Sequence, residues 1–582
     1  MMADPRNYRR QILSEFGPQH PFCDQVHAEK YRGQHESFPE AMNRISSAMS
    51  DGEEHYRQFR DVIRCMRFMP AGRVQSAMGS SRQVTPYNCY VSGKIEDSFT
   101  QGHGNIMQRQ TEAVETLRLG GGIGYDFSTL RPRGASVTST GSNSTGPVSV
   151  MGGFDAYCRM IAASGHRRGA QMGVMRIDHP DIEEFIHAKQ NSNELTGFNM
   201  SVAVTDDFMH ALLGDRGFEL KFEGRVHRTV NPVALWEMLM RSTWDWGEPG
   251  VLFIDTINKM NNLWYCEDIA ATNPCGEQPL PPYGACLLGS FNLVKYLRGT
   301  SPITRDCVTF DWQGFMDDIP DVVRAMDNVV DRATYPLYEQ KVEAQSKRRM
   351  GLGVTALANA LEAIRMPYGT EEFCDMERRI LTVLRDEAYM ASAMLAKEKG
   401  PFKLYNAEKF CSGEFFKTLP DHVQDAIREH GIRNSHLLSI APCGTISLSA
   451  DNVSSGVEPV FSFEALRLVN MPEGQVEVPL KDYGFDKLGV KGKAAADVTV
   501  EEHLRVLTTA ARLVDSAVSK TLNVPHTMPW DEFKQIYVKA WESGAKGCTT
   551  FTSGGKREGI LKAVAEEGGA CTIGDDGIRS CE

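Results

Sequence analysis

The stretch NPCGEQPLPPYGAC, residues 273–286, places two thiols, a carboxylate and an amide within one short segment. Its prolines and glycines exclude a helix or a central strand, so we expect a loop. In an extended backbone, residues two apart project to the same side, so Asn273, Cys275 and Glu277 are expected to face one ligand. Glu277 is suited to general acid–base catalysis and Asn273 to holding a hydroxyl. Spacing alone equally allows a proline-rich surface loop with two incidental thiols.

The length and composition limit the classes of protein to which the chain can belong. The chain has 582 residues, of which 41% are apolar and 24% charged. This length fits three or four average domains, or one large α/β barrel with additions. A net charge of -12 argues against a nucleic-acid partner. The start, MMADPRNYRRQ, lacks the apolar region of a secretory signal, and no apolar run is long enough to span a membrane. We therefore expect a cytoplasmic protein without a membrane partner.

The cysteines do not form a zinc-binding pattern. There are fourteen, and no Cys-x-x-Cys pair occurs among them. Structural zinc sites normally use such close pairs, so we expect no structural metal site. Most of the thiols are expected to be small buried apolar residues.

Three regions can be distinguished along the chain. Residues 1–67 have the pattern of polar helices, and residues 68–556 alternate helical stretches with short β-like or glycine-rich ones, as α/β folds do. Residues 557–582 are polar and glycine-rich, and we expect a flexible tail.

Two helices are predicted with defined ends. Residues 374–400 have apolar side chains at helical spacing, and the pattern stops at Gly400. Residues 499–519 open with Thr499 and Glu502 at the spacing of a capping box.

Glycine clusters mark possible phosphate sites. The glycines of 119–127 do not fit a dinucleotide fingerprint, and no Walker A pattern is present. Residues 141–147 and 441–449 combine glycine with small hydroxyl residues, which can offer donors to a phosphate. The alternative for each is an ordinary capped turn.

The segment that begins at Asn273 resembles the finger loop of ribonucleotide reductase catalytic subunits. Further segments are similar to that family in the same order along the chain: FMPAGR (68–73), NCYV (88–91), EDSF (96–99), GGGIGYDFSTLRPRGA (121–136), GHRRGAQMGVMRIDHPDIEEFI (165–186), FNMSVAVTDDFM (198–209) and APCGTISLSADNVSSGVEP (441–459). The resemblance implies a ten-stranded α/β barrel with the finger loop at its centre.

The resemblance also implies the chemistry of the loop. Cys275 would carry a transient thiyl radical and take the 3′ hydrogen of a ribose. Glu277 would accept the 3′-hydroxyl proton, and Asn273 would bind the sugar hydroxyls. Cys89 and Cys286 would supply two electrons and become a disulfide in each turnover.

Other roles follow from the same resemblance. A thiol pair in the tail would carry electrons from a thioredoxin or glutaredoxin-type reductant, and a dNTP effector site would lie at a homodimer interface. The tail thiols are Cys571 and Cys581. The residues implied to bind the ribonucleoside di- or triphosphate substrate are Ala71, Gly72, Asn88, Gly122, Pro442, Gly444, Thr445 and Ser447. Those implied to bind the effector are Asp97, Ser98, Arg131, Asn143, Arg167 and Arg168.

The source of the radical is read from the end of the chain. Residues 544–561 contain no tyrosine pair of the oxygen-dependent class, and no glycyl-radical motif is present. The adenosylcobalamin-dependent class remains. No Asp-x-His-x-x-Gly motif occurs, so we expect no metal ligand from the protein. Two alternatives stay open: an oxygen-dependent catalytic subunit with a metal-loaded partner, and a non-catalytic nucleotide-binding relative.

Overall fold

A ten-stranded sheet forms the centre of the computed structural model, which describes residues 16–138, 141–162, 170–190, 194–214, 216–299, 308–471 and 474–552. Most neighbouring strands are parallel, and the order is β1-β13-β2-β3-β6-β7-β10-β20-β19, with β16 also paired to β13. The strands are β1 (Phe68–Pro70), β2 (Cys89–Val91), β3 (Gly122–Asp126), β6 (Gln171–Arg176), β7 (Phe198–Val204), β10 (Gly250–Phe253), β13 (Ala285–Asn292), β16 (Met350–Thr355), β19 (Thr521–Val524) and β20 (Gly547–Thr552).

The sheet closes into a barrel through two short extended stretches. Leu352 of β16 forms a parallel bridge with Leu438, and Ile440 forms the next bridge with Val518, three residues before β19 begins. The backbone bond from the Ser519 N–H to the Ile440 carbonyl, 2.8 Å long, continues this path. The predicted ten-stranded α/β barrel is therefore confirmed.

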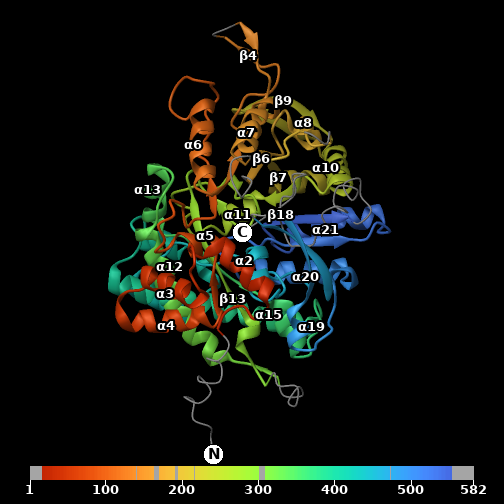
Figure 1. Ribbon diagram of the computed structural model, residues 1–582. Helices are drawn as coiled ribbons and strands as arrows, with labels where there is room; N and C mark the ends of the chain where they lie inside the picture. The colour runs from red at the N-terminus through yellow and green to blue at the C-terminus, as the bar shows by residue number, and fades with distance from the viewer. Residues whose placement is uncertain are drawn as a thin grey trace, which may run out of the picture.

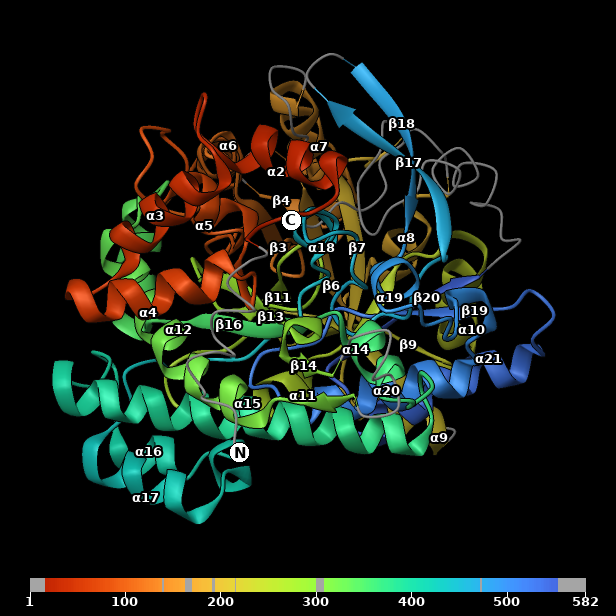
Figure 2. The same ribbon diagram turned by 60° about the horizontal axis from the view of Figure 1, so that its bottom comes forward.

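Helices cover the outside of the barrel (Figure 1). The long helix α15 runs along one side, with α16 and α17 outside it (Figure 2). The helices named below are α2 (Pro21–Tyr31), α3 (Phe38–Met49), α4 (Gly52–Arg64), α6 (Ile106–Arg118), α7 (Pro147–Ala162), α12 (Trp312–Arg332), α13 (Tyr338–Lys347), α15 (Glu371–Lys399), α16 (Ala407–Cys411), α17 (Asp421–His430), α18 (Gly444–Ser449), α20 (Val500–Ala511) and α21 (Trp530–Glu542).

The burial of these segments is typical of central strands that are covered on both faces. Every residue of β7, β13 and β16 is buried, as expected for strands covered on both faces. Glycines appear where backbones approach closely. A Cβ on Gly353 would lie 2.3 Å from the carbonyl oxygen of Ser439, so only glycine fits between β16 and the closing stretch.

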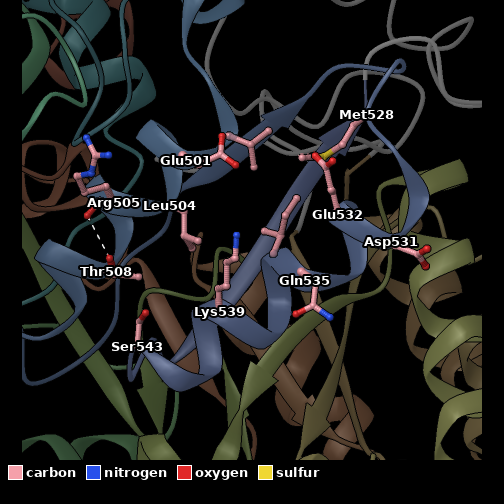
Figure 3. Close-up of a pocket in the computed structure, with 12 residues that line it drawn as sticks. Glu501, Leu504, Arg505, Thr508, Met528, Asp531, Glu532, Gln535, Lys539 and Ser543 are labelled. Carbon is pink, nitrogen blue, oxygen red and sulfur yellow. Dashed lines mark hydrogen bonds between the residues drawn. The ribbon is translucent and has the colours of Figure 1, made fainter. Parts of the chain in front are cut away.

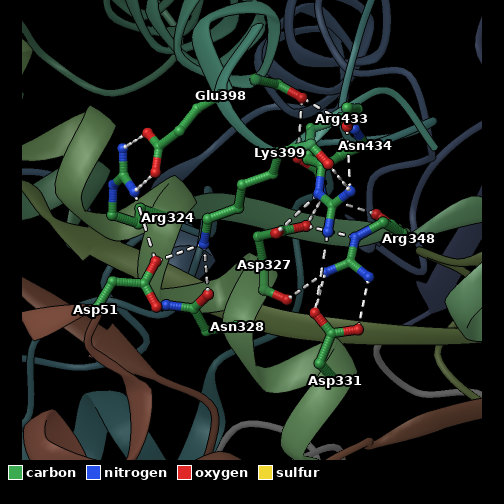
Figure 4. A network of polar contacts seen from close by, with 12 residues as sticks. Asp51, Arg324, Asp327, Asn328, Asp331, Arg348, Glu398, Lys399, Arg433 and Asn434 are labelled. Atoms are coloured by element: carbon green, nitrogen blue, oxygen red, sulfur yellow. Dashed lines mark hydrogen bonds and ion pairs between the residues drawn. The ribbon is translucent and has the colours of Figure 1, made fainter. Parts of the chain in front are cut away.

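The N-terminal helices pack onto the barrel rather than standing apart. Side chains of α3 and α4 belong to the same hydrophobic core as the strands. Asp51, at the start of α4, pairs with Arg324 and Arg332 of α12 and with Lys399 at the end of α15 (Figure 4). The network continues through Asp327 and Arg348. The division at residue 67 stays a prediction, and the one at 556 lies outside the described residues.

The two predicted helices are both present, and one is shorter than expected. The first is α15, which ends before Gly400. The second, α20, has the expected capping box of Thr499 and Glu502 but ends at Ala511 rather than at residue 519. Backbone groups beyond it serve the barrel instead: the Ser516 N–H donates to the Leu438 carbonyl.

Among the helices of the described residues, none is long and apolar enough to cross a lipid bilayer.

Candidate active site

The loop at the barrel centre is a tight hairpin, not the extended segment that the spacing predicted. The strands β11 (Ala271–Thr272) and β12 (Pro279–Leu280) pair antiparallel. Between them the Asn273 N–H donates to the Gln278 carbonyl (3.0 Å) and the Gly276 N–H to the Asn273 carbonyl (3.1 Å). Gly276 has φ +81°, which suits glycine. Although the chain reverses, the side chains of Asn273 and Glu277 still lie on the same side of the hairpin, where both contact Cys89.

The barrel wall holds this loop by buried hydrogen bonds. Asn199 of β7 donates from Nδ2 to the Pro274 carbonyl (2.8 Å). On the opposite wall, the Ser439 hydroxyl and the Ala517 N–H both donate to the Glu277 carbonyl, at 3.0 and 2.9 Å. The loop is thus fixed from strands far apart in sequence, which gives its side chains defined positions.

Asn273 and Glu277 converge on the sulfur of Cys89. The Asn273 amide donates to Cys89 Sγ (3.1 Å), and that thiol donates to Glu277 Oε1 (3.7 Å). Asn273 Oδ1 accepts from the Gln278 N–H (2.9 Å), which fixes the orientation of the amide. Asn273 and Glu277 are each only 1% exposed, so an amide, an acid and a thiol share an enclosed site.

Cys89 and Cys286 lie directly opposite one another. They are Cα partners in the antiparallel pairing of β2 and β13, and both are free thiols. Opposed residues have Cα atoms about 4.5–5.5 Å apart, inside the range of a disulfide. Burial raises the pKa of both thiols well above the usual value, so both are protonated near neutral pH.

Cys275 lies at the tip of the hairpin. It is one half of a disulfide, whereas every other cysteine in the described ranges is a free thiol. This disulfide has to be reduced before the Cys275 sulfur can carry a hydrogen atom.

The residues predicted to bind substrate fall into two places. Ala71, Gly72 and Pro442 line a small pocket together with Glu277 and Cys443. Gly444, Thr445 and Ser447 follow at the start of α18, next to this pocket. Asn88 and Gly122 lie elsewhere, behind the loop: the Gly122 N–H donates to the Asn88 carbonyl (2.8 Å), and a Cβ on Gly122 would lie 3.1 Å from the Pro274 ring.

Four of the six residues predicted to bind an effector are described, and three of them are connected. Arg131 Nε donates to Asp97 (2.5 Å), and Arg131 Nη1 donates to the Ser136 carbonyl (3.0 Å). Ser136 is the strand partner of Asn143 in the hairpin of β4 (Ser136–Val137) and β5 (Ser142–Asn143). The Ser98 hydroxyl accepts from the Gln101 N–H.

Four predicted residues lie outside the described residues. They are Arg167, Arg168, Cys571 and Cys581.

Sequence reasoning missed the residues that hold the loop. Asn199 lies in the strand FNMSVAV, where Ser201 is the other polar residue, and a buried amide there needs a partner. That asparagine was the available signal. Ser439 and Ala517 act on the loop through a hydroxyl and a backbone N–H, which no sequence pattern marks.

A second pocket lies away from this site, on the outer surface between α20 and α21 (Figure 3). Leu504, Ile536 and Met528 line it, with Glu501 and Lys539 among its charged residues. None of the predicted site residues lines it.

Among the described residues, no group of three or more His, Cys, Asp or Glu side chains is placed to hold a metal ion.

Comparison with known proteins gives the family. The family described as "Ribonucleotide reductase, barrel domain" matches residues 88–483 and 490–551, which include the loop and both opposed cysteines. The chain belongs to the ribonucleotide reductase family. The matched residues include the hairpin that carries Asn273, Cys275 and Glu277.

Individual relatives extend over more of this ribonucleotide reductase chain. A vitamin B12-dependent ribonucleoside-diphosphate reductase of Mycobacterium tuberculosis (strain CDC 1551 / Oshkosh) is 33% identical and covers 91% of this chain and 78% of the relative. A protein of the same name from Thermoplasma acidophilum is 29% identical, covering 91% and 69%. A vitamin B12-dependent ribonucleotide reductase of Streptomyces clavuligerus is 26% identical, covering 82% and 58%.

Proposed function

We propose that the protein reduces ribonucleotides to 2′-deoxyribonucleotides through a thiyl radical on Cys275, with adenosylcobalamin as cofactor. The observation that carries the proposal is the convergence of Asn273 and Glu277 on Cys89, directly opposite Cys286 and inside a closed barrel. The similar proteins from Mycobacterium tuberculosis and Thermoplasma acidophilum, whose names state dependence on vitamin B12, support the choice of cofactor.

Each residue of the site has one task in this reaction. The Cys275 radical takes the 3′ hydrogen atom of the ribose, and Glu277 accepts the proton of the 3′-hydroxyl. Asn273 binds the sugar hydroxyls through its oriented amide. Cys89, the thiol in contact with both, gives a proton to the departing 2′-hydroxyl, which leaves as water. Cys89 and Cys286 together lose two electrons and two protons and form a disulfide.

Burial suits these residues to radical chemistry. A radical reacts with whatever reaches it, so the site must exclude water and other reactants. Asn273, Glu277, Cys89 and Cys286 are all buried. Because both thiols keep their protons near neutral pH, they can act as donors of hydrogen to the ribose.

The side chains of the site fit adenosylcobalamin as the source of the radical. When bound, this cofactor supplies an oxidising carbon radical that removes the hydrogen atom from a thiol. The chain would contribute the half-buried Cys275 at the tip of the hairpin, whose reduced thiol would give up the hydrogen atom.

The substrate-binding site, the effector-binding site and the homodimer belong to the same proposal. The pocket lined by Ala71, Gly72 and Pro442 beside Glu277, with α18 next to it, is the proposed place for a ribonucleoside di- or triphosphate. The connected group of Asp97, Arg131 and Asn143 is the proposed dNTP effector site. A carboxylate held by an arginine can accept from a ribose hydroxyl, which supports this assignment. The protein is proposed to act as a homodimer.

Reduction of the disulfide between turnovers is assigned to the tail. Cys571 and Cys581 are proposed to exchange first with Cys89–Cys286 and then with thioredoxin or a glutaredoxin-type protein. Changing both tail cysteines to serine should abolish turnover with the protein reductant and leave turnover with a small dithiol largely intact. Equal loss with both reductants would contradict this shuttle.

The decisive variant is Cys275→Ser, which changes one atom at the tip of the hairpin. It should abolish ribonucleotide reduction while nucleotide binding and thermal unfolding stay close to those of the unmodified protein. Cys266→Ser is the matched control, because Cys266 is exposed and a free thiol, and it should retain activity. Substantial reduction by Cys275→Ser would contradict the assignment of the radical thiol.

A further inference from the structure

A buried cluster of charges lies next to Cys286, on β13. In the parallel pairing of β13 with β16, Leu287 is the partner of Met350, so the preceding residues, Cys286 and Arg349, are neighbours across the same two chains. Arg349 is 2% exposed. The Arg349 side chain is thus enclosed, and its residue neighbours, across the two paired segments, the residue whose thiol the proposed reaction oxidises and reduces.

Arg349 is held in place by ion pairs and a histidine. Arg349 Nη1 lies 2.9 Å from Glu343, and Nη2 pairs with Glu267. Lys347 Nζ bridges the same two acids, at 2.9 Å from Glu343 and 2.8 Å from Glu267. Arg349 Nε donates to His436 Nδ1 (3.3 Å), and burial and Arg349 lower the pKa of His436 far enough to keep it neutral. These contacts fix the position of the Arg349 guanidinium.

The two opposed thiols therefore meet different charges. Burial is the largest cause of the raised pKa of both. For Cys89, the next influence is Glu277, which raises the pKa further. For Cys286, the next influence is Arg349, which lowers the pKa, and it comes before the opposing effects of Asp515, Glu277 and Glu343. A cation thus favours a negative charge on Cys286, whereas the Glu277 carboxylate disfavours one on Cys89.

We propose that Arg349 is a positioning residue which makes Cys286 the leaving thiolate when the Cys89–Cys286 disulfide is reduced, so that the incoming thiol attacks Cys89. The inference rests on the proposed function, which supplies the disulfide. A thiolate forms a bond to Cys89 Sγ, the Sγ–Sγ bond breaks, and its electron pair goes to Cys286 Sγ, which later takes a proton. The second thiol of the dithiol then attacks its partner sulfur and releases Cys89. The dithiol loses two electrons and the protein disulfide gains them.

Access supports the same direction of attack. Cys89 contacts Asn273 and Glu277 and so faces the space that the product leaves. Cys286 is fully buried, and its thiol donates to the Leu287 carbonyl (3.5 Å). A thiol entering through the substrate space meets Cys89 first. Because exchange is faster when the leaving thiolate is better stabilised, charge and access favour one product.

The test traps the mixed disulfide in the full-length protein with both tail cysteines, Cys571 and Cys581, changed to serine, so that the tail cannot take over the disulfide. This protein, oxidised by one turnover without reductant, is treated with one equivalent of a mass-tagged monothiol, quenched with acid and alkylated. Peptide mapping should find the tag on Cys89 and the alkyl group on Cys286. A tag on Cys286 would overturn the inference while leaving the proposed function intact. If turnover forms no Cys89–Cys286 disulfide at all, the proposed function itself fails.

A matched pair of variants tests the part played by Arg349. Arg349→Gln should slow the first exchange step by roughly tenfold and spread the tag over both cysteines. Arg349→Lys, which keeps the charge, should restore most of the rate. Arg348→Gln is the control: Arg348 is also buried and ion-paired, but with Asp327 and Asp331 on the side of α12, and it should leave the position of the tag unchanged. Equal rates and tag positions in Arg349→Gln and the unmodified protein would overturn the inference.

Discussion

The carbonyl oxygen of Thr272 lies 1.8 Å from the point that a Cβ on Gly124 would occupy. Thr272 is the last residue of the first strand of the hairpin that carries Cys275, and Gly124 is in the middle of β3. The hairpin thus enters the barrel by resting its backbone on a strand that has no side chain at the point of contact.

Gly124→Ala should displace the hairpin. A backbone carbonyl cannot move aside as a flexible side chain can, so we expect a loss of about 1–3 kcal/mol in the free energy of unfolding and a large loss of turnover. Gly152→Ala is the control, because a Cβ on Gly152, in α7, meets nothing within 4 Å. Urea unfolding and turnover check both variants. A fully active Gly124→Ala protein would contradict the position of the loop.

Glu277→Gln keeps the shape of the side chain and removes its ability to accept a proton. Turnover should fall about 100-fold or more, the usual contribution of a general base. Substrate binding, measured by calorimetry, should change little. A variant that loses binding in proportion to turnover would indicate that Glu277 only holds the nucleotide.

One turnover without a reductant should consume two thiols per active site. Peptide mapping should find them as a Cys89–Cys286 disulfide, since the two residues are strand partners. Cys89→Ser and Cys286→Ser should each block repeated turnover with any reductant. A disulfide that involves neither these two cysteines nor the tail pair, Cys571 and Cys581, would be inconsistent with this account.

The alkylation of Cys89 should depend on pH in a characteristic way. Burial and Glu277 disfavour its thiolate, so its pKa in the folded protein is raised and the thiol stays protonated at neutral pH. Its rate of reaction with iodoacetamide should still be rising at about pH 9.5, beyond the usual cysteine pKa of about 8.5. Circular dichroism at each pH checks that the fold persists. A rate that levels off below about pH 8 would mean that Cys89 is an activated thiolate rather than a hydrogen donor.

The sequence predicted which residues lie close together better than it predicted the backbone conformation that brings them there. Asn273 and Glu277 were identified from their spacing, but the extended backbone assumed for them is wrong, because Gly276 reverses the chain. The pairing of Cys89 with Cys286 came from family resemblance, since no local pattern joins residues so far apart in sequence. The end of α20 was placed too late because the backbone of 516–519 is recruited by the barrel, a tertiary effect that helical periodicity does not register.

The central claim is that this chain generates its own radical on Cys275 with adenosylcobalamin. The most direct measurement uses the purified full chain, the cofactor tritiated at its 5′ carbon and a dithiol, with no iron, manganese or partner protein added. We expect ribonucleotide reduction together with washout of tritium into water, and neither of these with Cys275→Ser. Reduction that occurs only with a metal-loaded partner protein, without tritium exchange, would contradict the account.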